Sequence, residues 1–143
     1  MDFNDCVAFA VENPVVWLAT SEGDQPHVRV LAMSFADESG FYFQIGGAKD
    51  VCHQLQKNPK VEMGFYKPDG QMGKVMRVAG KVEFLNDASL KRRVLEDRPF
   101  LKSFGLTPEH PDLVIFRIAR GHAWFWTFAA NLEPKRMIPF GGK

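Results

Sequence analysis

The sequence has only two cysteines, no long apolar run and no excess of charge, and each absence excludes a class of protein. Cys6 and Cys52 are not part of a Cys-x-x-Cys pair. A disulfide scaffold or a cysteine zinc site is therefore disfavoured, and a reducing cytoplasm is the expected location. No apolar run approaches the ~18 residues needed to span a bilayer, and the acidic segment Met1–Asp5 lacks the cationic region of a secretory signal.

The charge balance argues against a general nucleic-acid-binding protein. The 143 residues include 18 Lys and Arg against 17 Asp and Glu, for a net charge of +1. Nucleic-acid binding needs clustered basic surface, whereas the one basic run, 91–93, is typical of a solvated helix face. The four histidines have no metal-ligand spacing, so no metal site is expected. No nucleophile motif is present either, and we name no catalytic residue.

Apolar periodicity predicts a mainly β fold with flanking helices, in a single domain over residues 1–143. The predicted helices cover residues 2–13, 49–57 and 87–97, and 98–110 is expected to be irregular with one helical turn. The predicted strands cover 15–20, 27–35, 41–45, 61–66, 75–84, 113–119 and 122–128, with a break at Arg120–Gly121 between the last two. Residues 132–143 are expected along the surface or against a partner chain. Six or seven short strands joined by tight turns favour a closed or nearly closed β-barrel.

Arg29 stands out because it interrupts the apolar strand 27–35. Both faces of this strand are largely apolar, so we expect it to lie deep in the fold. A charge there needs a partner, because unpaired burial is costly. One interpretation is a salt bridge at the barrel rim. The other is a guanidinium directed at a phosphate, which its planar fork suits.

Lys49 adds weight to the phosphate interpretation. It follows Gly46-Gly47-Ala48 at the expected start of a helix. Helix N-termini attract anions, and glycines allow a ligand to approach the backbone. Because the preceding strand is joined to the Arg29 strand by a hairpin, the two cations are expected to converge on one phosphate. Gln44, just before the glycines, is either an edge-strand residue facing water or a partner for a heterocycle edge.

Aromatic residues concentrate on the last predicted strand. Alternation places Trp124, Trp126 and Phe128 on one face. Such a set favours a core or an oligomer interface, and it could also form the wall of a planar cofactor site.

The ordered set of these features resembles the FMN-binding split-barrel family related to pyridoxamine 5′-phosphate oxidase. The segments that carry the resemblance are Arg-Val-Leu at 29–31, Phe-Tyr-Phe-Gln at 41–44, Gly-Gly-Ala-Lys at 46–49 and Gln-Leu-Gln-Lys-Asn-Pro at 54–59. The family is a homodimer of six-stranded barrels with two FMN in the interface. By resemblance Arg29 and Lys49 hold the phosphate, and the remaining flavin contacts are Val30, Leu31, Gln44, Ile45 and Trp124, the last near a position where a partner-chain aromatic closes the site.

Three departures argue against oxidation of pyridoxamine phosphate itself. The oxidases' substrate-phosphate lysine corresponds to Ser34, a flavin-contacting glutamine corresponds to Val75, and the C-terminal Arg-x-His signature is missing. The resemblance therefore implies an FMN flavoprotein, an oxidoreductase that reduces an unknown small substrate or carries electrons. The alternative is a non-catalytic dimeric barrel that acts as a sensor or stress-related module. Relatives of this architecture also take a deazaflavin or haem, for which His27 or His122 could serve as axial ligand.

Overall fold

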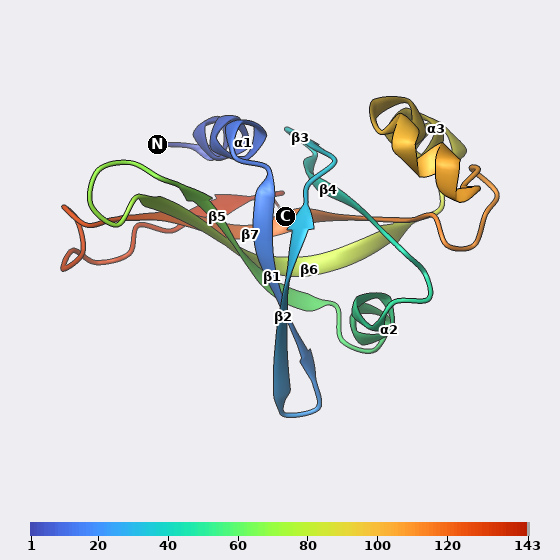
Figure 1. Cartoon of the computed structure of the whole chain (residues 1–143). Helices are drawn as coiled ribbons and strands as arrows, with labels where there is room; N and C mark the ends of the chain where they lie inside the picture. Colours follow the sequence, from blue (N-terminus) through green and yellow to red (C-terminus); the bar gives the residue numbers. More distant parts are fainter. Residues whose placement is uncertain (143) are drawn as a thin grey trace.

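A computed structural model describes residues 1–142 and shows a bent antiparallel sheet flanked by helices (Figure 1). Within these residues there are eight strands, three α-helices and one 3-10 helix. Their order is α1 (Phe3–Glu12), β1 (Val15–Glu22), β2 (Gln25–Ala32), β3 (Phe35–Asp37), β4 (Gly40–Ile45), α2 (Asp50–Lys57), β5 (Lys60–Lys67), β6 (Lys74–Leu85), α3 (Ala88–Asp97), η1 (Pro99–Phe104), β7 (Val114–Thr127) and β8 (Ile138–Phe140).

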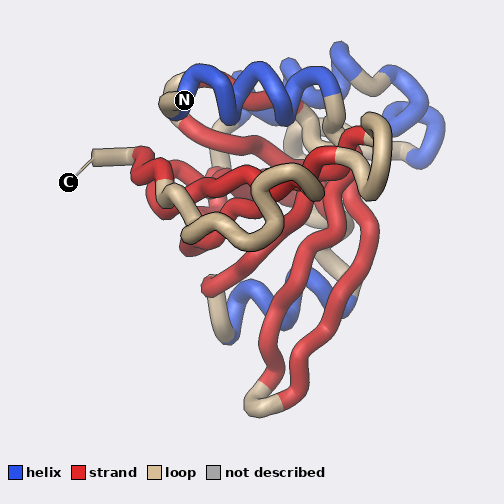
Figure 2. The backbone as a smooth tube through the Cα atoms, turned by 90° about the vertical axis from the view of Figure 1, so that its left-hand side faces the viewer, coloured by secondary structure: helices blue, strands red, loops and turns tan. Residues whose placement is uncertain are grey.

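The sheet runs in the order β2-β1-β5-β6-β7-β4-β3, and β8 pairs with β7. The β1–β2 hairpin extends beyond the body of the molecule, with α2 beside it (Figures 1 and 2). The mainly β barrel with flanking helices is thus confirmed. The strand number rises from the predicted six or seven to eight. The predicted strand 27–35 divides into β2 and β3, and β8 is added near the C-terminus; β3 and β8 are each only three residues long.

Buried aromatic rings fill the interior. The side chains of Phe41, Phe43, Phe65 and Phe116 are fully buried. Because each ring removes a large apolar area from water, these residues dominate the stabilisation of the barrel. Helix α1 closes one side, where Phe3 stacks on Phe140 of β8 at 4.6 Å between ring centroids.

A second, smaller core holds α3 and η1 together as a cap, which we define as residues 88–113. The buried members of this core are Val94, Leu95, Leu101 and Leu113 of the cap and Ile115 of β7. Arg98 ties this cap to the end of β2: its Nη2 donates to the carbonyl oxygens of Ala32 at 2.9 Å and Met33 at 2.8 Å. The cap therefore has a fixed position beside the barrel.

One prediction about the last third of the chain was wrong, and another was correct only in part. The expected break at Arg120–Gly121 is absent, because β7 continues through it and Gly121 pairs with Gly80 on β6. A Cβ on Gly121 would lie 2.0 Å from the Ala79 carbonyl oxygen, so glycine permits this close crossing rather than ending the strand. The C-terminal segment runs along the surface over residues 132–137, as expected, and then returns to its own sheet, where Ile138 and Phe140 of β8 are buried.

The prediction that the Arg29 strand lies deep in the fold was also wrong. β2 is the edge strand of the sheet, and Val28 and Val30 are 61% and 47% exposed. Val28 and Val30 lie on the outer face of β2, so the apolar residues of that face belong to the protein surface and not to the core.

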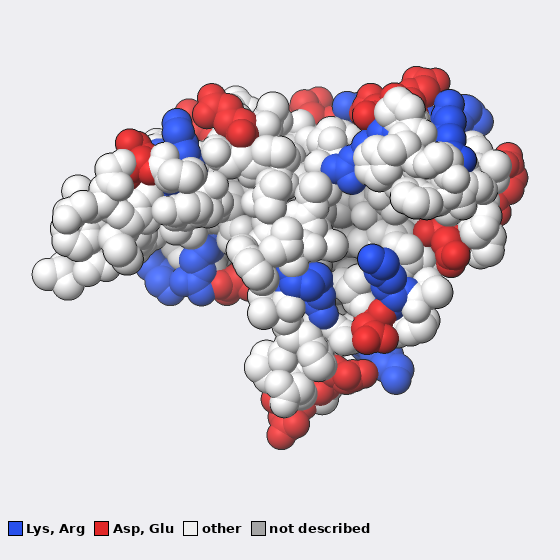
Figure 3. All heavy atoms as spheres, in the orientation of Figure 1, with Lys and Arg blue, Asp and Glu red and all other residues white. Residues whose placement is uncertain are grey.

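No helix within residues 1–142 has the length and apolar character required to cross a bilayer. Charged residues of both signs are scattered over the face seen in Figure 3, with broad uncharged areas between them. This face shows no single basic patch of the kind that binds nucleic acid.

Candidate functional site

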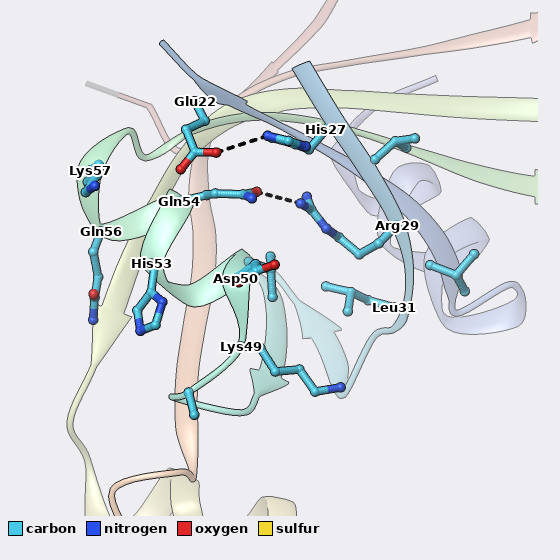
Figure 4. Close-up of a pocket in the computed structure, with 14 residues that line it drawn as sticks. Glu22, His27, Arg29, Leu31, Lys49, Asp50, His53, Gln54, Gln56 and Lys57 are labelled. Carbon is cyan, nitrogen blue, oxygen red and sulfur yellow. Dashed lines mark hydrogen bonds and ion pairs between the residues drawn. The ribbon is translucent and has the colours of Figure 1, made fainter. Parts of the chain in front are cut away.

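A cleft of about 1040 Å³ lies between β2 and α2 (Figure 4). One wall comes from residues 27–31 of β2, and the other from the loop before α2 and from α2 itself. Its lining residues are Glu22, His27, Val28, Arg29, Val30, Leu31, Ala48, Lys49, Asp50, Val51, His53, Gln54, Gln56 and Lys57.

Arg29 extends from β2 across the cleft to Gln54 on α2 (Figure 4). Its Nη2 donates to Gln54 Oε1 at 2.6 Å, and its Nη1 donates to Thr20 Oγ1 at 2.9 Å and to the Leu18 carbonyl oxygen at 3.2 Å. Thr20 Oγ1 in turn donates to Gln54 Oε1 at 2.6 Å. Thr20 and Gln54 are buried, so this network fixes the guanidinium in one orientation.

All acceptors of Arg29 in this network are neutral. Among residues 1–142, no carboxylate oxygen lies within 4.0 Å of the guanidinium in an ion pair, so the rim salt bridge is not formed. Burial lowers the pKa of the Arg29 guanidinium, and the nearby Asp50 carboxylate raises it. A half-buried, oriented cation without a bonded anion is a suitable donor for an anionic ligand.

Lys49 is exposed and precedes the first residue of α2, as the N-cap. Its aliphatic stem folds over Gly46, where an added Cβ would lie 3.4 Å from Lys49 Cγ. The ammonium group extends toward Leu31 on the opposite wall (Figure 4). Gly47 holds this loop against the cap, because a Cβ there would lie 2.6 Å from the Pro111 carbonyl oxygen.

Asp50 is a charge that opposes an anion in this cleft. It begins α2 and lines the cleft between the two cations. An acidic residue in the first turn interacts favourably with the positive end of the helix dipole. Its carboxylate nevertheless repels a phosphate bound in the cleft. The cleft therefore presents two cations and one carboxylate near the helix start.

A second cavity of about 570 Å³ adjoins the cleft. Both are lined by Leu31, Ala48, Lys49 and Val51, and only the second is lined by Gln44 and Ile45. The structure thus brings Arg29, Val30, Leu31 and Lys49 together in the cleft, with Gln44 and Ile45 next to it, around the shared residues Leu31 and Lys49.

Trp124 does not reach this cleft within one chain. It lies on β7, four positions from β2 in the sheet order, and lines a separate cavity of about 460 Å³. Its side chain is buried, with the Arg77 guanidinium 5.1 Å and the Lys135 ammonium 5.3 Å from the ring centroid. The core interpretation of this residue fits the single chain.

Sequence reasoning missed Thr20, Asp50 and Gln54 as parts of the site. Gln54 carried a detectable signal, because it lies on the buried side of α2 with Val51 and Leu55. A polar residue within an apolar stripe requires a buried partner. Thr20 gave no such signal, since threonine is common in strands.

The histidines do not form a metal centre. Among residues 1–142 no group of three or more His, Cys, Asp or Glu side chains is placed to hold a metal ion. His27 lines the cleft, where its Nε2 is 3.2 Å from Glu22 Oε1, whereas His122 is exposed on β7. The two axial-ligand candidates for haem therefore lie on different strands and do not face one site.

Comparison with known proteins assigns the family. The sequence model of the pyridoxamine 5′-phosphate oxidase family matches residues 4–127. Over 74 residues the chain is 38% identical to pyridoxine/pyridoxamine 5′-phosphate oxidase from Pseudomonas putida (strain GB-1), a match that covers 51% of this chain and 34% of that protein. The chain thus spans about a third of the length of this curated relative.

Solved structures agree over nearly the whole chain. A NimC/NimA family protein from Clostridium acetobutylicum has a TM-score of 0.78 at 26% identity, covering 96% of this chain and 92% of that one. General Stress Protein 26 from Bacillus anthracis has a TM-score of 0.74 at 17% identity, covering 98% and 100%. The family match covers most of the sequence and the fold agrees throughout, so this chain belongs to the pyridoxamine 5′-phosphate oxidase family.

Proposed function

We propose that this protein is an FMN-binding flavoprotein and an oxidoreductase acting on a small substrate. The observation that carries the proposal is the oriented Arg29 guanidinium, which has only neutral acceptors and faces the same cleft as Lys49. A phosphate monoester supplies the anion that this arrangement lacks. Phosphate oxygens suit a planar guanidinium and an ammonium together, and the N-terminus of α2 adds its dipole.

The remaining lining fits a ribityl chain and a flat ring. Arg29 and Lys49 would hold the phosphate, while the exposed backbone and side chains of Val30 and Leu31 would line the ring. Gln44 offers an amide to the ring edge from the adjoining cavity, next to Ile45. The flavin itself would supply hydride or electron transfer, and these residues bind and orient it.

The substrate is not pyridoxamine phosphate in this proposal. The position of the oxidases' substrate lysine holds Ser34, whose Oγ is buried and has no hydrogen-bond partner among residues 1–142. Val75, at the position of a flavin-contacting glutamine, lines the cavity of Trp124 instead of the cleft. The Ser34 hydroxyl carries no charge to neutralise a substrate phosphate, and the Val75 side chain offers no hydrogen bond to a flavin.

A second copy of the chain completes the site in this proposal. The outer face of the β1–β2 hairpin is apolar and exposed, with Val15 at 55% and Trp17 at 57% exposure. Trp17 pairs with Val30 of β2 on one side and with Gly64 of β5 on the other. In the same cross-strand row, Gly64 pairs with Arg77 of β6, and Arg77 pairs with Trp124 of β7. Residues paired across strands share a sheet face. A two-fold partner on this face would bring its own Trp124 toward the cleft.

Two ligands and two proteins test the phosphate assignment. If Lys49 makes a charge-assisted hydrogen bond of roughly 1.5–3 kcal/mol, Lys49→Ala should weaken FMN binding by about tenfold to a hundredfold. Riboflavin lacks the phosphate, so it should bind poorly to both proteins and to nearly the same extent. Isothermal titration with each flavin measures the four dissociation constants. Equal weakening of FMN and riboflavin would remove Lys49 from the phosphate site.

Turnover then separates an enzyme from a binding module. We expect NADH, NADPH or reduced ferredoxin to reduce the bound FMN, which can be followed by the loss of the absorbance of oxidised flavin. Tight FMN binding with no reduction by any of these donors would favour a non-catalytic sensor. We also propose a cytoplasmic location, supported by Cys6 and Cys52 being free thiols.

A further inference from the structure

The cavity beside the cleft has a wall that the proposed flavin site does not use. Its barrel side is formed by Leu31, Gln44 and Ile45, and it encloses about 570 Å³. The opposite side belongs to the cap, where Leu101, Phe104 and Leu106 are apolar and His110 and Asp112 are polar. Leu101 is buried in the cap core, so this wall is held in place. The chain thus builds a second compartment with a largely apolar boundary, which shares Leu31 and Lys49 with the cleft.

His110 places one oriented donor in this apolar compartment. Its Nδ1 accepts the backbone N–H of Asp112 at 3.0 Å, and both residues line the cavity. The proton of the neutral imidazole is therefore on Nε2, which makes that nitrogen a donor. Across residues 1–142, no hydrogen bond uses His110 Nε2 within the protein. The ring is half-buried, so a ligand acceptor would compete with little water.

The charges around the cavity balance. Lys49 and Asp112 both line it and carry opposite signs. Neither an anion nor a cation is therefore favoured over a neutral molecule, and the apolar walls disfavour a strongly hydrated one.

We propose that this cavity binds a small, planar, largely apolar molecule with one hydrogen-bond acceptor, such as a ring ketone, which His110 Nε2–H orients. Leu101, Phe104 and Leu106 would contact its ring, and the acceptor would point to His110. That such a molecule reacts with the flavin rests on the function proposed above, whereas its binding does not. The cavity adjoins the cleft at Leu31 and Lys49, which would place the molecule next to the flavin ring.

Titration of the protein with 1-acetonaphthone and 1-ethylnaphthalene, with and without saturating FMN, tests the proposal. The two probes have similar size and differ in the ketone oxygen. One neutral hydrogen bond should make the ketone bind about five- to tenfold more tightly. His110→Phe keeps an aromatic ring but removes the donor, and it should abolish this preference. Amide shift changes in the wild-type NMR spectrum should centre on the cavity lining, which locates the probe even if that variant folds poorly.

Phe104→Ala and Phe100→Ala form a matched pair for the apolar wall. Both rings are on η1 and exposed, at 72% and 58%, but only Phe104 lines the cavity. Phe104→Ala should weaken both probes at least fivefold, and Phe100→Ala should leave them within twofold.

Equal binding of the two probes to wild type, or equal effects of the two alanine variants, would overturn the proposal. Probe binding without FMN binding would retain the cavity and reject the flavin function. FMN binding without probe binding would retain the flavin function and reject the cavity proposal.

Discussion

Gln54 offers a test in which protein stability and ligand affinity should change separately. Its buried Oε1 accepts hydrogen bonds from Arg29 and Thr20, both at 2.6 Å. Gln54→Met keeps the length of the side chain but removes the acceptor. The lost Thr20 bond costs about 1 kcal/mol, and the Arg29 bond adds about 1–2 kcal/mol after discounting for its partial exposure. We therefore expect the free energy of unfolding to fall by about 2–3 kcal/mol.

Gln54→Glu should produce the opposite pattern. The carboxylate keeps an acceptor for Thr20 and forms an ion pair with Arg29, so the free energy of unfolding should stay within about 1 kcal/mol of wild type. The added negative charge offsets Arg29 where the FMN phosphate would bind. At about 6–8 Å and an effective dielectric constant of 20, this repulsion is on the order of 2–3 kcal/mol. The dissociation constant for FMN should then rise about 30- to 150-fold.

Urea unfolding of the flavin-free proteins and titration with FMN measure both quantities. Gln56→Glu is the matched control, because it adds the same charge to an exposed position of the same helix that lines the cleft but makes no hydrogen bond to Arg29. It should change FMN affinity less than threefold. The reasoning is refuted if Gln56→Glu weakens FMN as much as Gln54→Glu, or if Gln54→Met and Gln54→Glu weaken it equally.

Three further outcomes are expected. Asp50→Asn removes the carboxylate that opposes the phosphate, so FMN should bind several-fold more tightly in low-salt titrations, and weaker binding would contradict this role. Trp17→Glu places a charge on the exposed apolar face, so a dimer seen by light scattering should dissociate; an unchanged mass would exclude this face as the interface. Burial raises the pKa of the Cys6 thiol from 9.0 to about 11, helped by Asp5 and Asp2. The unfolded thiol therefore releases its proton first, and the free energy of unfolding should fall as pH rises from 9 to 11, less steeply in Cys6→Ser by urea unfolding.

The local pattern of the sequence was sufficient to predict most of the helices and strands and to single out the two cations, Arg29 and Lys49. Apolar alternation located strands such as β5, because side chains on a strand alternate between two faces, and a short continuous apolar run located β4. Asn13-Pro14 and Asn58-Pro59 followed the ends of α1 and α2, since proline disfavours helical backbone before it. Arg29 was prominent because a charge in an apolar strand requires a partner, and that rule holds without coordinates.

Tertiary structure decided which groups meet and which face water. The sequence of an apolar strand is the same whether its outer face packs in the core or lies on the surface. Only the order of strands in the sheet shows that β2 is an edge strand and that Val28 and Val30 are exposed. The Arg29–Thr20–Gln54 network joins three elements, and no local pattern encodes contacts across 9 and 25 residues of sequence. The cavity wall around Phe104 likewise exists only because the cap packs beside the barrel. Local propensity acts over a few residues, whereas burial and hydrogen bonding are satisfied by the folded chain as a whole.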